Sequence, residues 1–189
     1  MRRRQLQTPQ DTSGDPAGAD SGHLSCAGGT VKTLVFFYSR TGTTRAAAQE
    51  IASACGCPAV EIVDRKDRSG PAGYLSAGKD AMRRRLTDIA PVPRDPSEAE
   101  VVVVGTPVWA FTVSPAVRTF LSQHAGRLPQ VAFFCTQGGC GGKRALREMT
   151  ALAGKQPVAT LVLNEREMRS GAFRSRVRAF VSQFSHGDR

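Results

Sequence analysis

The sequence predicts an α/β fold in which five parallel strands form a doubly wound sheet. Short apolar runs alternate with amphipathic stretches along the whole chain, which is the pattern of repeated strand–helix units. The runs at 34–38 and 101–104 lack the alternation of a half-exposed strand, so both faces of these strands are expected to be buried. The length of 189 residues, with 40% hydrophobic residues, is sufficient for one domain with a substantial core.

The N-terminal part is expected to contain a tail followed by the first strand–helix–strand unit. Residues 1–29 are rich in Gly, Ser, Asp and Pro and are predicted to be a disordered tail, which leaves 30–186 as the folded domain. The first strand is predicted at 33–38 and the first helix at 44–55, where apolar residues recur at i, i+3, i+4 and i+7. A short second strand is predicted at 59–63.

The middle of the chain is predicted to supply a basic helix, the central strand and a functional loop. Apolar residues at helical spacing predict an amphipathic helix at 73–88, with Leu75, Met82, Leu86 and Ile89 on its inner face. Four consecutive valines predict a buried strand at 101–104. A loop is expected at 106–113, and Ser114 followed by Pro115 is typical of a helix start.

The C-terminal part continues the alternation. A fourth strand is predicted at 131–134, followed by a glycine-rich loop at 135–142 and a helix at 143–153. A fifth strand at 158–163 and a last helix at 170–184 complete the domain. Ligands of doubly wound sheets bind outside the carboxyl ends of the strands, so the loops after strands one, three and four are the candidate site.

Charge and hydropathy exclude several classes of function. The net charge is +10, but the basic residues lie mostly on predicted amphipathic helices without interleaved aromatic residues, so we do not expect a nucleic-acid binder. No run approaches the length of a membrane span, and no apolar segment follows the basic N-terminus as in a secretory signal. We therefore expect a cytoplasmic protein.

The cysteines do not form a recognisable metal or disulfide pattern. The five cysteines are scattered and odd in number, and the three histidines do not cluster near them, so no metal site is predicted. A redox pair of Cys135 and Cys140 stays open as an alternative to two structural thiols. No side chain has the pattern of an acid–base catalyst, because Tyr38 and the histidines have structural explanations, and catalytic residues are left unassigned.

The loop after the first strand resembles the phosphate loop of the flavodoxin family. The segment Ser39-Arg40-Thr41-Gly42-Thr43-Thr44 matches the pattern [S/T]-x-T-G-x-T at every fixed position, between a predicted strand and a predicted helix. Thr106-Pro107-Val108-Trp109 resembles the first loop that flanks the flavin in this family, and the glycine-rich loop resembles the second. The resemblance extends from about residue 33 to 184 and implies the flavodoxin-like strand order 2-1-3-4-5, which places the three loops side by side.

The resemblance implies that FMN is the cofactor. The phosphate would be held by hydroxyl and amide groups of the first loop, and Trp109 would stack on the flavin ring or instead serve as a core or lid residue. The second loop would offer backbone N–H groups to the ring. The cofactor-binding residues implied by the resemblance are Ser39, Arg40, Thr41, Gly42, Thr43, Thr44, Thr106, Pro107, Val108, Trp109, Thr136, Gln137, Gly138, Gly139 and Gly142. Arg40 and Arg45 are expected to be solvated, because phosphate sites of this family typically lack a salt bridge.

Three functions remain open at this level. The first is an FMN-dependent oxidoreductase for electron or hydride transfer with NAD(P)H or a quinone, because positive surroundings favour the anionic reduced flavin. The second is a non-enzymatic electron carrier for an acidic redox protein partner. In carrier flavodoxins the charges are usually the other way round, since the carrier itself is acidic. The third is a flavodoxin-like binding module that has lost FMN.

Overall fold

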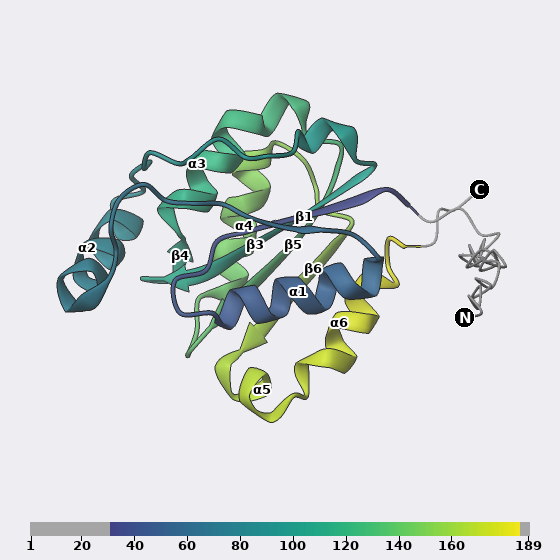
Figure 1. Ribbon diagram of the computed structural model, residues 1–189. Coiled ribbons are helices and arrows are strands. Elements are labelled where there is room, and N and C mark those ends of the chain that lie inside the picture. The colour runs from purple at the N-terminus through teal and green to yellow at the C-terminus, as the bar shows by residue number, and fades with distance from the viewer. Residues whose placement is uncertain (1–30, 186–189) are drawn as a thin grey trace, which may run out of the picture.

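The computed structural model describes residues 31–185, which form a six-stranded sheet with helices on both faces (Figure 1). The predicted tail and residues 30 and 186 of the predicted domain lie outside the described residues. The strands are β1 (Thr33–Phe37), β2 (Ala59–Glu61), β3 (Val101–Trp109), β4 (Thr112–Val113), β5 (Gln130–Gln137) and β6 (Ala159–Asn164). The helices are α1 (Thr43–Cys55), α2 (Gly70–Met82), α3 (Pro115–His124), α4 (Gly142–Ala153), α5 (Glu165–Ser170) and α6 (Phe173–Val181), with single 3₁₀ turns at Pro96–Glu98 and Ala125–Arg127.

The parallel strands follow the order β2-β1-β3-β5-β6, which confirms the predicted order because β5 and β6 are the fourth and fifth parallel strands. The register places Phe36 beside Val104 and Val104 beside Phe133 across the three central strands. The carboxyl ends of β1, β3 and β5 therefore meet at one edge of the sheet. This edge carries the three loops selected from the sequence.

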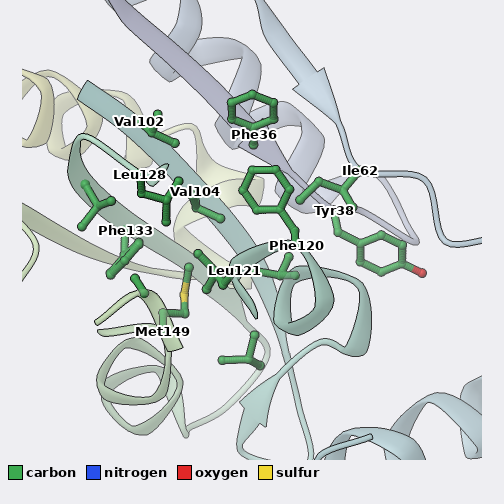
Figure 2. Packing of buried hydrophobic residues seen from close by; sticks show 14 of the residues in the cluster. Phe36, Tyr38, Ile62, Val102, Val104, Phe120, Leu121, Leu128, Phe133 and Met149 are labelled. Atoms are coloured by element: carbon green, nitrogen blue, oxygen red, sulfur yellow. The ribbon is translucent and has the colours of Figure 1, made fainter. Parts of the chain in front are cut away.

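Two apolar layers hold the helices against the sheet. Figure 1 shows α1 and α6 on one face and α3 and α4 on the other. On the second face Phe36, Phe120 and Phe133 are fully buried, and Figure 2 shows them packed with Leu121 around the central strands. Tyr38 lies at the margin of this cluster, and its hydroxyl points away from the apolar side chains (Figure 2).

Gly105 allows the centre of the sheet to pack closely. A Cβ atom at this position would lie 2.0 Å from Cζ of Phe134, a side chain that is fully buried. No carbon atom can be placed at that distance, so the ring of Phe134 occupies the space that a side chain at Gly105 would need. Glycine here serves packing rather than flexibility.

The predicted loop at 106–113 is mostly a β-hairpin, so this part of the sequence prediction was wrong. β3 continues to Trp109 and pairs antiparallel with β4, with Val108 opposite Val113 and Trp109 opposite Thr112. Ala110 and Phe111 form the two-residue turn with φ of 46° and 63°. Positive φ at both turn residues gives a twist that matches the flanking strands, although neither residue is of the type usual there.

The predicted helix at 73–88 was also wrong in its position and its inner face. α2 covers Gly70–Met82 instead, because Ser69 stands at the N-cap and Pro71 at the start of the helix. Leu75 and Met82, expected to be buried, are 72% and 71% exposed. Figure 1 shows the reason, since α2 stands at one side of the molecule rather than over a face of the sheet.

The predicted last helix at 170–184 is interrupted. Gly171, at φ 75°, ends α5, and α6 begins two residues later. α5 starts with a capping box, in which the backbone N–H of Asn164 donates to the Glu167 carboxylate while the Asn164 side chain accepts from the Glu167 amide. The remaining elements differ from prediction by one to three residues at an end.

Candidate functional site

The loop between β1 and α1 has the conformation of an anion site. Gly42 is the N-cap of α1 at φ 93°, and a Cβ atom placed there would meet nothing within 4 Å. The Gly42 amide donates to Oγ of Ser39 at 3.1 Å, which fixes the turn while leaving the Ser39 hydroxyl proton free to donate. Since the N-cap has no side chain, the first amides of α1 stay available to a bound anion.

The threonines of this loop divide into two groups. Thr41 is exposed and Thr43 is half-buried, so both lie at the mouth of the loop. Thr44 is buried, and its Oγ1 lies 2.8 Å from Oγ1 of Thr136 at the end of β5. The Thr44 hydroxyl therefore connects the first predicted loop to the end of β5.

The arginines of the first loop differ in surroundings. Arg45, expected to be solvated, pairs with Glu61 at the end of β2, with Nη2 2.6 Å from Oε1. Arg40 is half-buried and lines a cavity of about 610 Å³ together with Tyr38 and Ser39. The Arg45–Glu61 pair holds the start of α1 to the sheet edge.

Trp109 is placed beside Tyr38 by the hairpin. The two rings meet edge to face, with centroids 5.5 Å apart and an interplanar angle of 89°. Burial raises the pKa of Tyr38 to about 12, so the phenol is neutral at physiological pH. Between the hairpin and α2 lies a cavity of about 510 Å³, lined by Val108, Trp109 and Ala110 on one side. Its volume is in the range of small-molecule sites.

The glycine-rich loop is shaped by the side chain of Gln137. Its Oε1 accepts from the amide of Gly142 at 2.7 Å, and its Nε2 donates to Oδ1 of Asn164 at 2.8 Å. A Cβ atom at Gly142 would lie 2.7 Å from that same Oε1, so the loop closes only around glycine. Gly138 and Gly139 are exposed at the tip and leave their backbone open to a ligand.

The hairpin and the glycine-rich loop are in direct contact. A Cβ atom at Gly141 would lie 2.7 Å from Cα of Phe111, and Gly141 itself has φ 104°. Of the other predicted site residues, Thr106 is buried and its Oγ1 donates to the carbonyl of Pro107 at 3.0 Å. The structure thus brings the three predicted loops together, through Thr44–Thr136, Tyr38–Trp109 and Phe111–Gly141.

A buried ion pair that the sequence did not reveal anchors the hairpin. Arg118 of α3 donates to Oε1 of Glu148 of α4 at 2.8 Å, and Thr112 of β4 donates to the other carboxylate oxygen. Burial alone would raise the pKa of Glu148, but the bonds from Arg118 and Thr112 hold it below its usual value. No local pattern marks this pair, since its members are 30 residues apart.

A second buried cluster lies between β2 and α2. The Arg68 side chain is 2% exposed, and it donates to Asp64 at 2.6 Å and to Asp80 at 3.0 Å. Asp64 and Arg68 lie in the same loop before α2, whereas the contact with Asp80 depends on the position of α2. This cluster links the base of α2 to the end of β2.

Among the residues that the structure describes, thiol and imidazole groups do not form a catalytic arrangement. Cys135 is buried, and burial raises the pKa of its thiol to about 12, whereas Cys140 is exposed. His124 is buried with Nδ1 2.9 Å from the carbonyl oxygen of Phe120. Within residues 31–185 no group of three or more His, Cys, Asp or Glu side chains is arranged to hold a metal ion. Over the same residues, no helix has the length and apolar composition needed to cross a bilayer.

Comparisons with known proteins identify the family and agree with the fold. The family model described as flavodoxin matches residues 32–183. A flavoprotein from Lactobacillus acidophilus, crystallised in complex with FMN, superposes with a TM-score of 0.62 at 21% identity and covers 75% of this chain and 99% of its own. The flavodoxin of Megasphaera elsdenii in its two-electron reduced form has a TM-score of 0.51 at 19% identity and covers 80% of this chain and 98% of its own. The flavodoxin of Fusobacterium nucleatum bound to flavin mononucleotide also has a TM-score of 0.51, at 13% identity, and covers 80% of this chain and 96% of its own. No curated protein sequence matches the chain.

Proposed function

Because the chain belongs to the flavodoxin family, we propose that it binds FMN at the carboxyl edge of its sheet and acts as an FMN-dependent oxidoreductase. The observation that carries this proposal is the uncapped start of α1, where Gly42 leaves open space in front of unpaired amides. The N-terminus of a helix is a site for anions such as a phosphate group.

The phosphate would be held by the first loop. Thr41 and Thr43 lie at its mouth and would add hydroxyl donors, while the amides of the first turn of α1 supply the remaining bonds. The Ser39–Gly42 and Thr44–Thr136 hydrogen bonds keep the loop in this conformation without the ligand, so little ordering entropy is lost on binding.

The flavin ring would lie against the hairpin. Trp109 offers an aromatic surface at the cavity beside Val108, and Tyr38 fixes the orientation of the indole by its edge-to-face contact. The backbone N–H groups of Gly138 and Gly139 would donate hydrogen bonds to the polar edge of the ring. The side chain of Gln137 sets the shape of the loop that carries these glycines. FMN supplies the electron-transfer chemistry when bound, and the chain positions it and limits its contact with water.

The net charge of the chain is relevant to the choice between an enzyme and an electron carrier. The chain has a net charge of +10, whereas carrier flavodoxins are acidic. Positive charge stabilises an anionic reduced flavin, and this favours electron or hydride transfer with NAD(P)H or a quinone. The same charge would suit a carrier that serves an acidic redox protein, and this is the second candidate. We place either function in the cytoplasm, in accord with free thiols at the four described cysteines.

The FMN site is tested by the colour of the purified protein and by placing a negative charge in the proposed phosphate loop. Purified protein should be yellow, and Thr41→Asp should release the flavin, because two unit charges about 4 Å apart repel by about 4 kcal/mol at an effective dielectric constant of about 20. With screening we expect at least about a hundredfold loss of FMN affinity, measured by flavin fluorescence. Thr160→Asp, at an exposed position of β6, is the matched control and should bind FMN normally. Equal affinity in both variants would exclude this loop as the phosphate site.

The oxidoreductase is separated from the carrier by turnover. FMN-loaded protein should oxidise NADPH in the presence of a soluble quinone and in proportion to enzyme concentration. If flavin is bound but no NAD(P)H or quinone turnover occurs, the enzyme proposal fails and the carrier remains.

A further inference from the structure

Exposed cations without ion-pair partners stand on both sides of the candidate site. Lys143, Arg144 and Arg147 lie at the start of α4, and Lys79 and Arg83 lie at the end of α2. All five side chains are exposed, and none forms an ion pair with another residue of the 31–185 segment. The free positive charge of this edge is therefore not balanced locally.

The carboxylates of the same two helices are directed inward. Asp80 of α2 is bound by Arg68, and Glu148 of α4 is bound by Arg118 at 2.8 Å. Their side chains are only 10% and 14% exposed. Each helix thus neutralises its acidic group inside the protein, and the charged side chains that remain on its outer surface are cations.

An apolar residue lies between the two groups of cations. Phe111, at the tip of the hairpin, is 55% exposed and contacts Gly141 immediately before α4. Its neighbour Ala110 lines the same cavity as Lys79 and Arg83. These contacts join the groups into one surface, which we call the cationic rim and which consists of Lys79, Arg83, Phe111, Lys143, Arg144 and Arg147.

We infer that the cationic rim docks an acidic redox protein, which exchanges electrons with the cofactor held at the carboxyl edge. Charge complementarity carries this choice, since a cluster of unpaired cations around an exposed aromatic residue matches an acidic surface with an apolar centre. In each encounter one electron leaves the metal centre of the reduced partner and one arrives at the flavin, and no covalent bond changes. The inference rests on the proposed FMN site and adds the surface on which an acidic partner would dock.

The test uses an acidic plant-type [2Fe–2S] ferredoxin as the probe. FMN-loaded protein is mixed with reduced ferredoxin in an anaerobic stopped-flow instrument, and flavin reduction is followed by absorbance. Long-range attraction is screened within about 10 Å at 0.1 M salt, so the second-order rate constant should fall at least about tenfold between about 20 mM and about 500 mM salt. Basic cytochrome c, used as an acceptor from the reduced protein, should show the opposite salt dependence.

Charge reversal then locates the surface. The variant Lys143→Glu/Arg144→Glu/Arg147→Glu should react at least about tenfold more slowly at low salt and match the unmodified chain at high salt. The control variant reverses the charges of Lys32, Arg94 and Arg178, which are also exposed and likewise lack ion pairs within the described segment. Lys32 and Arg94 precede β1 and β3, at the opposite edge of the sheet, so the control should lose no more than about threefold.

The outcomes separate this inference from the proposed function. Rates are expressed relative to photoreduction by neutral 5-deazariboflavin, which reports changes in the flavin itself. Equal losses in the two triple variants, or a rate that salt does not change, would overturn the docking surface while flavin binding stands. Binding of the unmodified chain to phosphatidylserine vesicles in preference to ferredoxin, lost only in the α4 variant, would assign the rim to lipid and also overturn it. Colourless protein that binds no FMN would instead refute the proposed function.

Discussion

Replacing Gly105 by alanine should destabilise the domain through one steric contact. The added Cβ would lie 2.0 Å from Cζ and 2.3 Å from Cε1 of Phe134. Carbon atoms in contact lie about 3.5–4.0 Å apart, so the ring must move by about 1.5 Å. Phe134 is 0% exposed and the interior is close-packed, so no space receives the displaced ring.

The size of the effect follows from this geometry. Overpacking a core typically costs about 1–3 kcal/mol, and a ring displaced at the centre of a sheet belongs at the upper end, about 3 kcal/mol. For a chain of this length we expect a decrease in Tm of about 6–12 °C. Urea denaturation followed by circular dichroism gives the free energy of unfolding, and differential scanning calorimetry gives Tm.

A matched substitution isolates the contact. Gly126→Ala lies in an exposed 3₁₀ turn, where a new Cβ would meet nothing within 4 Å, and should change stability by less than about 0.5 kcal/mol. Phe134→Leu should offset part of the cost of Gly105→Ala, so the double variant should be more stable than the sum of the two single changes predicts. If Gly105→Ala matches Gly126→Ala in stability, or if the two core changes are additive, the argument from close packing is wrong.

Three further predictions concern the buried charges and thiols. The pKa of Glu148 is lower in the folded than in the unfolded chain, so its contribution to stability is complete above the unfolded pKa of about 4.3 and is lost as the pH falls through the folded value. The variant Glu148→Gln lacks this contribution, and its free energy of unfolding should therefore fall less than that of the unmodified chain between about pH 5 and pH 3. Arg68→Met should lower the free energy of unfolding by about 3–5 kcal/mol, since it leaves buried carboxylates unpaired, whereas equal stability in urea titration would contradict a buried ion-pair cluster. Iodoacetamide near pH 7.5 should modify Cys140 and spare Cys135 in the folded protein, and peptide mass spectrometry that finds both equally modified would contradict the burial of Cys135.

The parallel sheet could be predicted because a strand that is buried on both faces requires a run of consecutive apolar residues. The valine run at the start of β3 and the apolar run of β1 exclude most alternatives to a buried strand. Gly42 within the hydroxyl-rich loop marked the start of α1 in the same direct way. Both features are encoded within a few consecutive residues.

The hairpin and the position of α2 were not predicted correctly, because the sequence signals for them are weak or depend on residues far apart in the chain. Ala110 and Phe111 adopt positive φ without being glycine or asparagine, so no turn residue announced the hairpin. For α2 the apolar spacing was misleading, because Leu75 and Met82 line the open cavity beside the hairpin and are not covered by a neighbouring layer. Ser69 and Pro71 gave the correct start. Helical spacing predicts a buried face only where a neighbouring layer exists.

The buried ion pairs could not be predicted from local pattern. Arg118 and Glu148 lie on separate helices, and only the packing of α3 beside α4 brings them together with Thr112. Gln137 was expected to serve a ligand through its backbone, and its side chain proved to connect the end of β5 to α4 and β6. Such contacts are set by the fold as a whole.

The two-residue turn at Ala110 and Phe111 also limits how the length of this segment can change. Trp109 faces Thr112 across a paired ladder, and a strand that slips by one residue turns every side chain to the opposite face. Because β3 is held by its parallel pairing with β1 and β5, an insertion or deletion at the turn would shift β4 and move Thr112 away from Glu148, even if every original residue were kept. Within this hairpin, the number of residues constrains the position of Thr112 as strongly as their identity does.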